Sequence, residues 1–262
     1  MSEPPATLAH PAVMNRPPEL SFAGMCTMCG NKGTFSGVRS PSRESFPCPS
    51  CRATLRYREQ AGAILSVFSH GRSHFLDHFR HQPECQRLAI LEAAIRGPFI
   101  RRFKDVPGYV RSYYFEDAVP GETRDGVICQ DLERMTFADA SFDLIITSDV
   151  MEHVFDVDAV IAETARVLRP GGAHIFSVPM VFPLRPGSTA RARRGPGGVE
   201  HLAEPRYHRS GLDEPSLVVT DFGADLAARH AERGLRARFH RSMPLTAVLN
   251  GNAVVVARRP LQ

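Results

Sequence analysis

The sequence lacks several features that would assign it to a special class of protein. Only two of its 32 basic residues are lysine, Lys32 and Lys104, which we attribute to coding bias. The formal net charge of +4 is too small to predict a nucleic-acid-binding protein by itself. No apolar run approaches the roughly 18–20 residues that a membrane span requires. The proline-rich N-terminus also lacks the basic and apolar segments of a signal peptide. We therefore expect a cytoplasmic protein that makes no membrane contact.

The length and composition predict one full-sized domain and a small module. The chain has 262 residues, of which 43% are hydrophobic and 23% charged, and these values are typical of globular proteins. Residues 1–21 are polar and rich in proline, so we expect a flexible tail there. A cysteine-containing module at 22–56, a helical bridge at 57–87 and a main domain at 88–262 are expected to follow.

Four of the six cysteines form two pairs with the spacing of a zinc site. Cys26 and Cys29 are followed, after eighteen residues, by Cys48 and Cys51. Each C-x2-C turn presents two thiolates to one edge of a tetrahedron. The alternative is two disulfides or four buried thiols, which a chain without a secretory signal does not favour. Because protein ligands would fill all four positions, we expect a zinc ribbon with a structural role.

Several arginines surround the second cysteine pair and the loop before it. They are Arg39, Arg43, Arg52, Arg56 and Arg58. Such residues can meet phosphates, but a solvated basic face is the interpretation that we favour. The bridge that follows has apolar residues at helical spacings, which predicts a helix beginning at Tyr57.

From residue 88 onward, short apolar runs alternate with amphipathic segments, which is the pattern of an α/β fold with a parallel sheet covered on both faces. The candidate strands are 88–93, 111–115, 126–129, 142–147, 173–178, 237–240 and 253–257. The candidate helices lie at about 98–104, 156–168 and 221–233. The middle helix has the clearest apolar stripe, and the sequence RPGG at 169–172 is expected to end it.

Two segments of the main domain carry recognisable motifs. Residues 141–154 read SFDLIITSDVMEHV, and residues 168–179 read LRPGGAHIFSVP. With this spacing they resemble the class I S-adenosylmethionine-dependent methyltransferases, in particular the group called methyltransferase type 11. The resemblance covers about 88–180 and extends to the C-terminal strand pair. It implies a Rossmann-like, doubly wound, mostly parallel seven-stranded sheet, but it does not identify a substrate.

The resemblance also implies which residues bind S-adenosylmethionine. Ligands of open parallel sheets bind at the carboxyl ends of the strands, near the switch in strand order. In this family one acid holds the ribose hydroxyls, an acid and an apolar residue meet the adenine, and the fourth strand ends near the reactive methyl group. The matching residues are Glu92 at the end of the first strand, Glu116 after the second, Asp131 and Leu132 after the third, and Ser148 and Asp149 after the fourth.

The turn after the first strand departs from the family pattern Glu/Asp-x-Gly-x-Gly-x-Gly. Here residues 92–98 read EAAIRGP, so Ala94, Arg96 and Pro98 occupy the three glycine positions and Gly97 is out of phase. Glycine allows a backbone to approach a ligand closely. The Arg96 side chain must therefore leave the pocket, or enter it and pair with the cofactor carboxylate or another anion. We keep Ala94, Arg96 and Gly97 as cofactor-binding candidates.

A long insertion at about 180–220 is rich in proline, glycine and arginine, and such segments are usually functional lids or disordered. In the resembling fold it lies over the substrate side, and its His201, Tyr207 and His208 match a pattern of the group. Transfer to a hydroxyl requires alignment and removal of a proton, to which a neutral histidine is suited near pH 7. These three residues and His153 are our catalytic candidates. The alternative is that the histidines are structural or exposed.

The sequence therefore predicts a methyltransferase that acts on a small molecule, a sugar or a natural-product intermediate, with oxygen as the expected acceptor atom. The basic insertion favours an anionic acceptor. One alternative is a ribosomal RNA methyltransferase with a zinc module, which the modest net charge does not favour. The sequence also lacks the Asn-Pro-Pro-Tyr type turn of enzymes that methylate base nitrogens. Ser148 and Asp149 begin the segment that occupies its place. Another alternative is a non-catalytic scaffold that has lost its cofactor.

Overall fold

The computed structural model describes residues 19–38, 44–180, 183–209, 215–240 and 252–261. Of the predicted tail at 1–21, residues 1–18 lie outside the described residues, and residues 19–21 belong to strand β1, Glu19–Met25. In the described part of the chain, no helix is long and apolar enough to cross a membrane.

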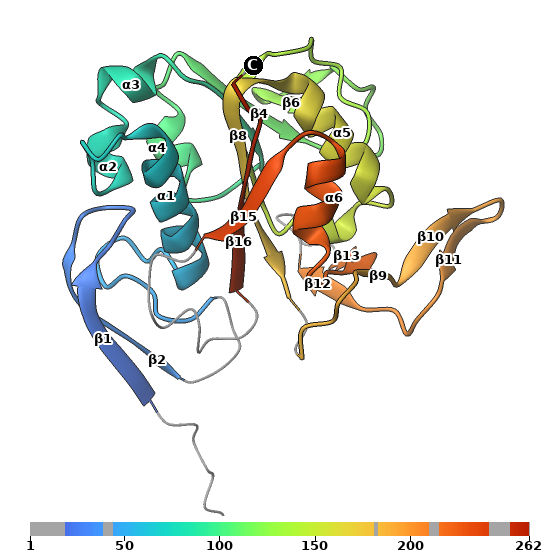
Figure 1. Ribbon diagram of the computed structural model, residues 1–262, viewed down its shortest axis with the longest axis horizontal. Coiled ribbons are helices and arrows are strands. Elements are labelled where there is room, and N and C mark those ends of the chain that lie inside the picture. Colours follow the sequence, from blue (N-terminus) through green and yellow to red (C-terminus); the bar gives the residue numbers. More distant parts are fainter. Residues whose placement is uncertain (1–18, 39–43, 181–182, 210–214, 241–251, 262) are drawn as a thin grey trace, which may run out of the picture.

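The main domain is built on one sheet of eight strands with the order β15-β16-β8-β7-β3-β4-β6-β5 (Figure 1). In chain order the strands are β3 Ala89–Ala93, β4 Gly108–Tyr113, β5 Thr123–Arg124, β6 Val127–Cys129, β7 Phe142–Ser148, β8 Leu168–Pro179, β15 Arg236–His240 and β16 Asn252–Arg258. Strands β6, β4, β3, β7 and β8 pair in parallel, whereas β16 is antiparallel to both of its neighbours. The Rossmann-like, mostly parallel fold is therefore confirmed.

All seven predicted strands are present, but the predicted number of strands was one too low. The eighth strand, β5, has two residues and pairs antiparallel with β6 at the edge of the sheet. Two exposed or half-exposed residues carry no periodic apolar signal, so the sequence could not have predicted them.

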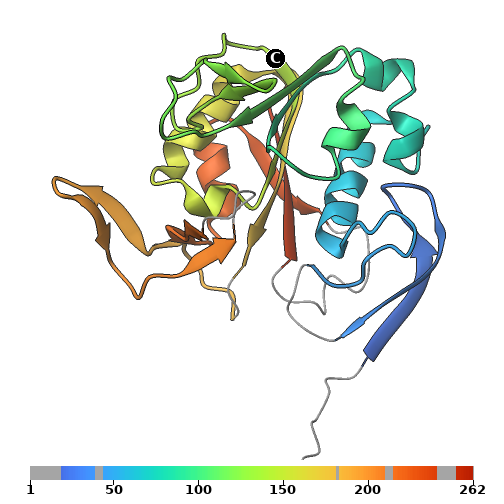
Figure 2. The same cartoon turned by 180° about the vertical axis from the view of Figure 1, so that it is seen from behind.

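Helices cover both faces of the sheet, so the central strands are buried on both sides (Figure 2). One face carries α1 Leu55–Phe68, α2 Leu76–Phe79, α3 Pro83–Gln86 and α4 Ile100–Phe103, and the other carries α5 Val157–Val167 and α6 Leu226–Glu232. Strand β16 shows the consequence, since Val254 and Val256 belong to the core under α1, and Val255 to the core under α5. Burial on both faces explains why these strands appear as continuous apolar runs.

Helix α5 begins and ends close to the predicted positions. The Asp156 side chain accepts a hydrogen bond from the Ala159 N–H at 2.9 Å and caps the N-terminus. The helix ends at Val167, and β8 follows directly. Gly171 has a φ of +82°, and a Cβ there would lie 2.9 Å from the Leu261 side chain. The predicted glycine turn therefore lies inside β8, where the pairing with β7 is irregular between Leu168 and Ala173, and it does not end the helix.

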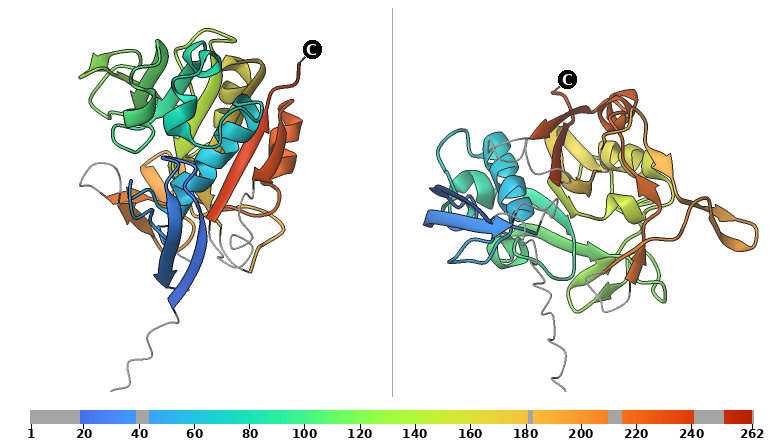
Figure 3. Two further views of the ribbon diagram at one scale, coloured as in Figure 1. Left: turned by 90° about the vertical axis from the view of Figure 1, so that its left-hand side faces the viewer. Right: turned by 90° about the horizontal axis from the view of Figure 1, so that it is seen from below.

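The N-terminal module is a hairpin with two cysteine turns, packed against the start of α1 (Figure 3). Strands β1 and β2, at Lys32–Val38, pair antiparallel in register from Glu19 with Val38 to Met25 with Lys32. Phe35 and Phe46 are fully buried with Leu55 and Ile64 of α1 in one core. The helix begins at Leu55, two residues before the predicted start of the bridge.

The insertion at about 180–220 contains regular structure where it is described. Its strands are β9 Thr189–Ala190, β10 Ala192–Gly195, β11 Gly198–His201, β12 Tyr207–Arg209, β13 Pro215–Leu217 and β14 Thr220–Asp221. The β10–β11 hairpin projects from the domain on the side opposite β1 and β2 (Figure 1). A short 3-10 helix at Met151–His153 follows β7 and contacts β14.

Candidate functional site

The strand order reverses between β3 and β7, and the carboxyl ends of these strands form the expected ligand edge. Glu92 lies at this edge, near the end of β3, and is only 3% exposed. Its Oε2 accepts a hydrogen bond of 2.5 Å from the Tyr109 hydroxyl of β4. Burial raises the pKa of Glu92 to about 7, and burial together with the neighbouring carboxyl group raises that of Tyr109. The edge thus contains a carboxyl group that changes charge near neutral pH.

The first turns of α1 pack against the carboxyl end of β7. The Arg56 guanidinium is buried, and its Nη1 lies 2.9 Å from Oδ2 of Asp149. Gln60 is fully buried, and its Nε2 donates to the Thr147 carbonyl at 3.0 Å. The Ser148 hydroxyl donates to Oε1 of Gln60 at 2.9 Å. Arg56 was interpreted from sequence as part of a solvated basic face, and this was wrong because α1 docks on the sheet at this point.

Asp149 is held by the protein itself. Its Oδ1 accepts a hydrogen bond from the Ser177 hydroxyl at 2.8 Å, and its backbone adopts a φ of +56°. Such a conformation is uncommon for residues other than glycine and occurs often at functional sites. Ser148 and Asp149 therefore lie at the predicted edge, and both already bind protein groups.

The altered glycine turn leaves its arginine exposed. Arg96 is exposed, so its guanidinium is accessible and is not packed into the protein interior. Ala94 and Gly97 are half-buried, and Gly97 has a φ of +157° that L-residues rarely adopt. A Cβ at Gly97 would lie 3.6 Å from Oε1 of Glu92, an ordinary contact distance. The backbone of the turn at Gly97 therefore passes close to the Glu92 carboxyl group.

The remaining predicted cofactor residues follow the strands on the other side of β3. Glu116 is exposed in the turn after β4, and Asp131 and Leu132 follow β6. Oδ1 of Asp131 accepts a hydrogen bond from the Glu133 N–H at 2.9 Å, and Leu132 is buried. Because β3, β4 and β6 are adjacent and parallel, these residues share the carboxyl edge of the sheet with Glu92.

The four paired cysteines converge in the N-terminal module. Their Sγ atoms all lie within 4.8 Å of one another; Cys26 and Cys51 are 3.8 Å apart, and Cys29 and Cys48 are 3.7 Å apart. Tetrahedral zinc with Zn–S bonds of about 2.3 Å requires sulfur–sulfur edges of about 3.8 Å. The thiols are free, and these distances are too long for disulfides. The residues present therefore fit a zinc ion.

Arg58 lies behind the cysteine cluster, and its burial was not predicted. It is 1% exposed, its Nη2 donates to the Phe46 carbonyl at 3.0 Å, and its guanidinium carbon lies 3.8 Å from the Phe35 ring centroid. Its Nε and Nη1 have no hydrogen-bond partner among the described residues. Four thiolates and one Zn²⁺ would carry two negative charges, which a buried guanidinium beside them partly offsets.

The catalytic candidates divide into two groups. His153 and His208 lie together, with ring centroids 5.6 Å apart and planes at 90°. His201 is exposed on β11, and Tyr207 is 53% exposed on β12. The structure also brings the buried Glu152 next to the two histidines, a residue that the sequence reasoning missed although the adjacent pair Glu-His was visible.

The arginines that made the insertion basic are paired with carboxylates. The pairs are Arg191 and Arg206 with Asp221, Arg193 with Glu200, and Arg194 with Glu133. Four of the six arginines at 185–209 thus face three carboxylates, which neutralise three positive charges within the protein and reduce the support for an anionic acceptor.

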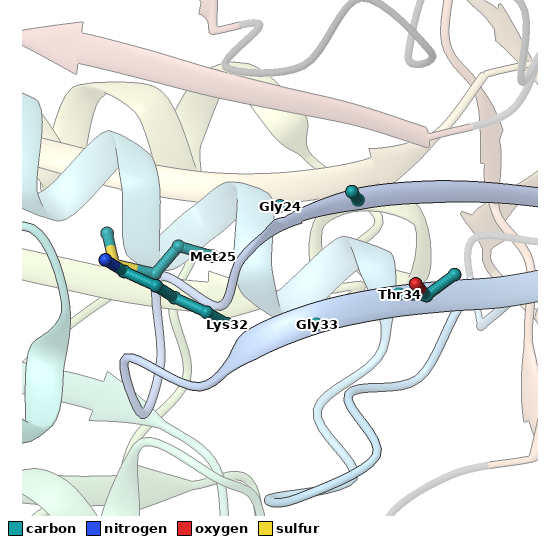
Figure 4. Close-up of a pocket in the computed structure, with 6 residues that line it drawn as sticks. Gly24, Met25, Lys32, Gly33 and Thr34 are labelled. Atoms are coloured by element: carbon teal, nitrogen blue, oxygen red, sulfur yellow. The ribbon is translucent and has the colours of Figure 1, made fainter.

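Surface hollows occur away from the predicted residues. One, of about 550 Å³, lies on the β1–β2 hairpin, where the Met25 and Lys32 side chains lie side by side (Figure 4). Another, of about 490 Å³, lies between α5 and the C-terminal segment and is lined by Arg166 and Arg259 among others. No predicted site residue lines either hollow.

Comparisons with known proteins find methyltransferases. Residues 109–176 match the family described as Methyltransferase domain. A probable S-adenosylmethionine-dependent methyltransferase of Mycolicibacterium smegmatis is 37% identical over 57 residues, 22% of each chain. The dimethylglycine N-methyltransferase of Parasynechococcus marenigrum is 44% identical over 48 residues, 18% of this chain and 17% of that one. The chain thus spans about a fifth of the length of these curated relatives.

The similarity to solved structures is lower in sequence identity. An S-adenosylmethionine-dependent methyltransferase of Mesorhizobium loti has a TM-score of 0.43 and 16% identity, covering 66% of this chain and 91% of that one. The 1,6-didemethyltoxoflavin-N1-methyltransferase of Burkholderia thailandensis has a TM-score of 0.45 and 15% identity, covering 79% and 87%. Likeness at this level says nothing about a substrate.

Proposed function

We propose that this protein is an S-adenosylmethionine-dependent methyltransferase whose cofactor lies across the carboxyl ends of β3 and β7. The observation that carries this proposal is the match of residues 109–176 to the Methyltransferase domain family. This segment runs from β4 into β8, and therefore supplies most of the strands around the switch in strand order. Open α/β sheets bind their ligands at that point.

The residues at the edge suit the polar parts of the cofactor. Glu116, an exposed carboxylate, would accept hydrogen bonds from the ribose hydroxyls, and Asp131 would accept one from the adenine amino group. Leu132 would flank the adenine ring, and the turn of Ala94 and Gly97 would approach the methionine part. The bound cofactor supplies an electrophilic methyl group, and the protein's own task is to align the acceptor with it.

The acceptor is proposed to be a small molecule, a sugar or a natural-product intermediate that is methylated at oxygen. Support comes from His153 and His208, which lie close to the end of β7 and suit removal of a hydroxyl proton near pH 7. One curated relative is named as an N-methyltransferase. A screen of acceptors could therefore instead find methylation at nitrogen.

We further propose that Cys26, Cys29, Cys48 and Cys51 bind one structural zinc ion. The support is the near-tetrahedral separation of their sulfur atoms. A closed set of four thiolates leaves no open position for a substrate, so the zinc would contribute to folding and not to the methyl transfer.

Calorimetric titration of the zinc-loaded protein with S-adenosylmethionine, and with its demethylated product, tests the proposed cofactor site. We expect wild type to bind both ligands. Glu116→Gln should weaken binding about tenfold or more, because a hydrogen bond to a charged group contributes about 1.5–3 kcal/mol. The matched control is Asp117→Asn, a neighbouring exposed carboxylate that pairs with Arg124, and its binding should stay unchanged. Absence of binding by wild type would instead favour the non-catalytic scaffold.

A methyl-transfer assay with labelled cofactor then separates the acceptor classes. Hydroxyl-bearing and amine-bearing small molecules are tested beside ribosomal RNA. Incorporation into RNA alone, with a steep dependence on salt concentration, would overturn the small-molecule assignment.

A further inference from the structure

Three potential metal ligands from two distant segments meet beside the end of β7. Glu152 and His153 belong to the 3-10 helix after β7, and His208 lies on β12 of the insertion. Oε1 of Glu152 lies 3.7 Å from Nε2 of His153 and 3.7 Å from Nδ1 of His208. One ligand atom from each residue lies within 4.8 Å of the others. The cluster therefore joins two segments that are more than fifty residues apart in the sequence.

Glu152 is the unusual member of this cluster. Its side chain is fully buried, and neither carboxylate oxygen has a hydrogen-bond partner among the described residues. Nδ1 of His208 is likewise a buried atom without such a partner in this part of the chain. Buried charged groups in proteins are normally paired, hydrogen-bonded or bound to a metal, because isolating them is costly. A cation between the Glu152 carboxylate and Nδ1 of His208 would give both groups a partner.

The orientation of His153 agrees with this interpretation. Its Nδ1 lies 2.7 Å from the Leu217 carbonyl, which can only accept a hydrogen bond. Nδ1 must therefore carry a proton, and in the neutral form of the ring the lone pair of Nε2 is directed toward Glu152. A histidine that binds a metal usually donates its other ring N–H to a carbonyl or a carboxylate in this way.

We propose that Glu152, His153 and His208 bind one divalent transition-metal ion, with zinc as the reference case. Two histidines and one carboxylate form a known ligand set for zinc and for non-haem iron, and both of these sites keep open positions. Ligands at about 2.1 Å from such an ion lie about 3.0–3.4 Å from one another. The two separations of 3.7 Å from Oε1 of Glu152 need to shorten by about 0.3–0.7 Å, and the two histidine nitrogens, within 4.8 Å of each other, need to approach as well.

The location gives the ion a role. The cluster begins three residues after Asp149, at the carboxyl end of β7 where the methyl group would be transferred. A metal ion with open positions can bind an acceptor oxygen and favour its deprotonated form. The ion would then replace His153 and His208 in removing the acceptor proton, because their lone pairs would be bound to it. This role rests on the proposed methyltransferase function, whereas metal binding by the three residues does not.

Metal content of matched variants tests the site. Wild type, Glu152→Gln, His208→Gln and the control His201→Ala are equilibrated with Zn²⁺, desalted and analysed by mass spectrometry, and circular dichroism confirms that each is folded. Wild type and the control, which alters an exposed histidine of the same insertion, should each carry one more zinc per chain than the two cluster variants. That difference is independent of the cysteine site, which contributes equally to all four proteins.

Calorimetry with Zn²⁺ on the same proteins gives the affinity. Loss of one ligand should weaken this binding event at least tenfold, and Zn²⁺ should raise the melting temperature of wild type more than that of either cluster variant. Equal zinc content in all four proteins would overturn the proposal, and so would loss of the ion in His201→Ala. Because no methyl transfer is measured, failure here is distinguishable from failure of the proposed enzymatic activity.

Discussion

The buried carboxyl group of Glu92 predicts a pH-dependent stability that one substitution can test. Glu92 is 3% exposed, and burial raises its pKa from the ordinary 4.5 to about 7, although the Tyr109 hydrogen bond and the Arg111 charge act in the opposite direction. The substitution Glu92→Gln keeps the size of the side chain and an acceptor oxygen for the Tyr109 hydroxyl. It removes only the ability to ionise.

The folded chain prefers the neutral form of Glu92, whereas the unfolded chain ionises this residue at its ordinary pKa. The stability linked to this group is therefore complete below a pH of about 4.5 and is lost as the pH rises through about 7. A difference of about 2.5 between the two pKa values corresponds to about 3 kcal/mol, at about 1.36 kcal/mol per pKa unit. Glu92→Gln does not undergo this loss, so its stability relative to wild type should rise by up to about 3 kcal/mol between pH about 5 and pH about 8.

Thermal unfolding followed by circular dichroism at both pH values measures the effect. In a chain of this size 1 kcal/mol corresponds to about 2–4 °C, so the relative gain should be about 6–12 °C. The control is Glu122→Gln, because hydrogen bonding to Arg124 lowers the pKa of this exposed carboxyl group. Its effect should be small and of opposite sign. If Glu92→Gln and wild type show the same pH dependence, Glu92 is not held neutral and the reasoning is refuted.

Two further predictions concern the N-terminal module and the helix that follows it. Removal of zinc by a chelator, or the substitution Cys48→Ser, should lower the melting temperature, because a metal bound only by the folded chain adds its binding free energy to folding; an unchanged melt of metal-free protein would contradict the structural role. Arg56→Met and Asp149→Asn should each destabilise the protein by about 1–3 kcal/mol, since each leaves a largely buried charge with fewer partners. A double-mutant cycle from denaturant unfolding should give a coupling of about 0.5–3 kcal/mol, and zero coupling would show that the ion pair contributes nothing.

The strands of the sheet could be predicted well because each one is recognisable from its own apolar residues. Each central strand is buried on both faces, so it had to be a short apolar run whatever its neighbours were. The α5 helix was equally visible, because its buried residues recur at helical spacing and a proline and two glycines follow it. Strand β5 and the short strands of the insertion have no such pattern, since they have only two to four residues each and most of these are exposed or polar.

The site was predicted less completely because its contacts join distant segments. Nothing in the local sequence shows that Arg56 would reach Asp149 or that Glu152 would meet His208. An arginine in sequence suggests exposure, and only the docking of α1 on the sheet buries Arg56 and Arg58. The cysteine cluster was predictable for the opposite reason, because each turn holds two of its cysteines within four residues.

The start of α1 explains how a module too small to form its own core can influence the edge of the main sheet. Thr54 occupies the N-cap position but makes no side-chain hydrogen bond to the helix, so the first turn lacks the usual cap. The module supplies one of the missing contacts, an acceptor for the Leu55 N–H, and adds a second contact to the first turn. The Leu55 N–H donates to the Ser45 carbonyl at 3.0 Å, and the Thr27 hydroxyl donates to the Arg58 carbonyl at 2.5 Å.

Each of these contacts comes from a residue close to one of the four clustered cysteines. Thr27 lies between Cys26 and Cys29, and Ser45 lies three residues before Cys48. The same helical turn then sends Arg56 to Asp149 at the carboxyl end of β7. A zinc ion that fixes the two cysteine turns would therefore also fix the first turn of α1, and through Arg56 it would limit the positions that Asp149 can adopt. The metal would thus act on the proposed cofactor edge by holding a helix end in place, although it lies in a different module.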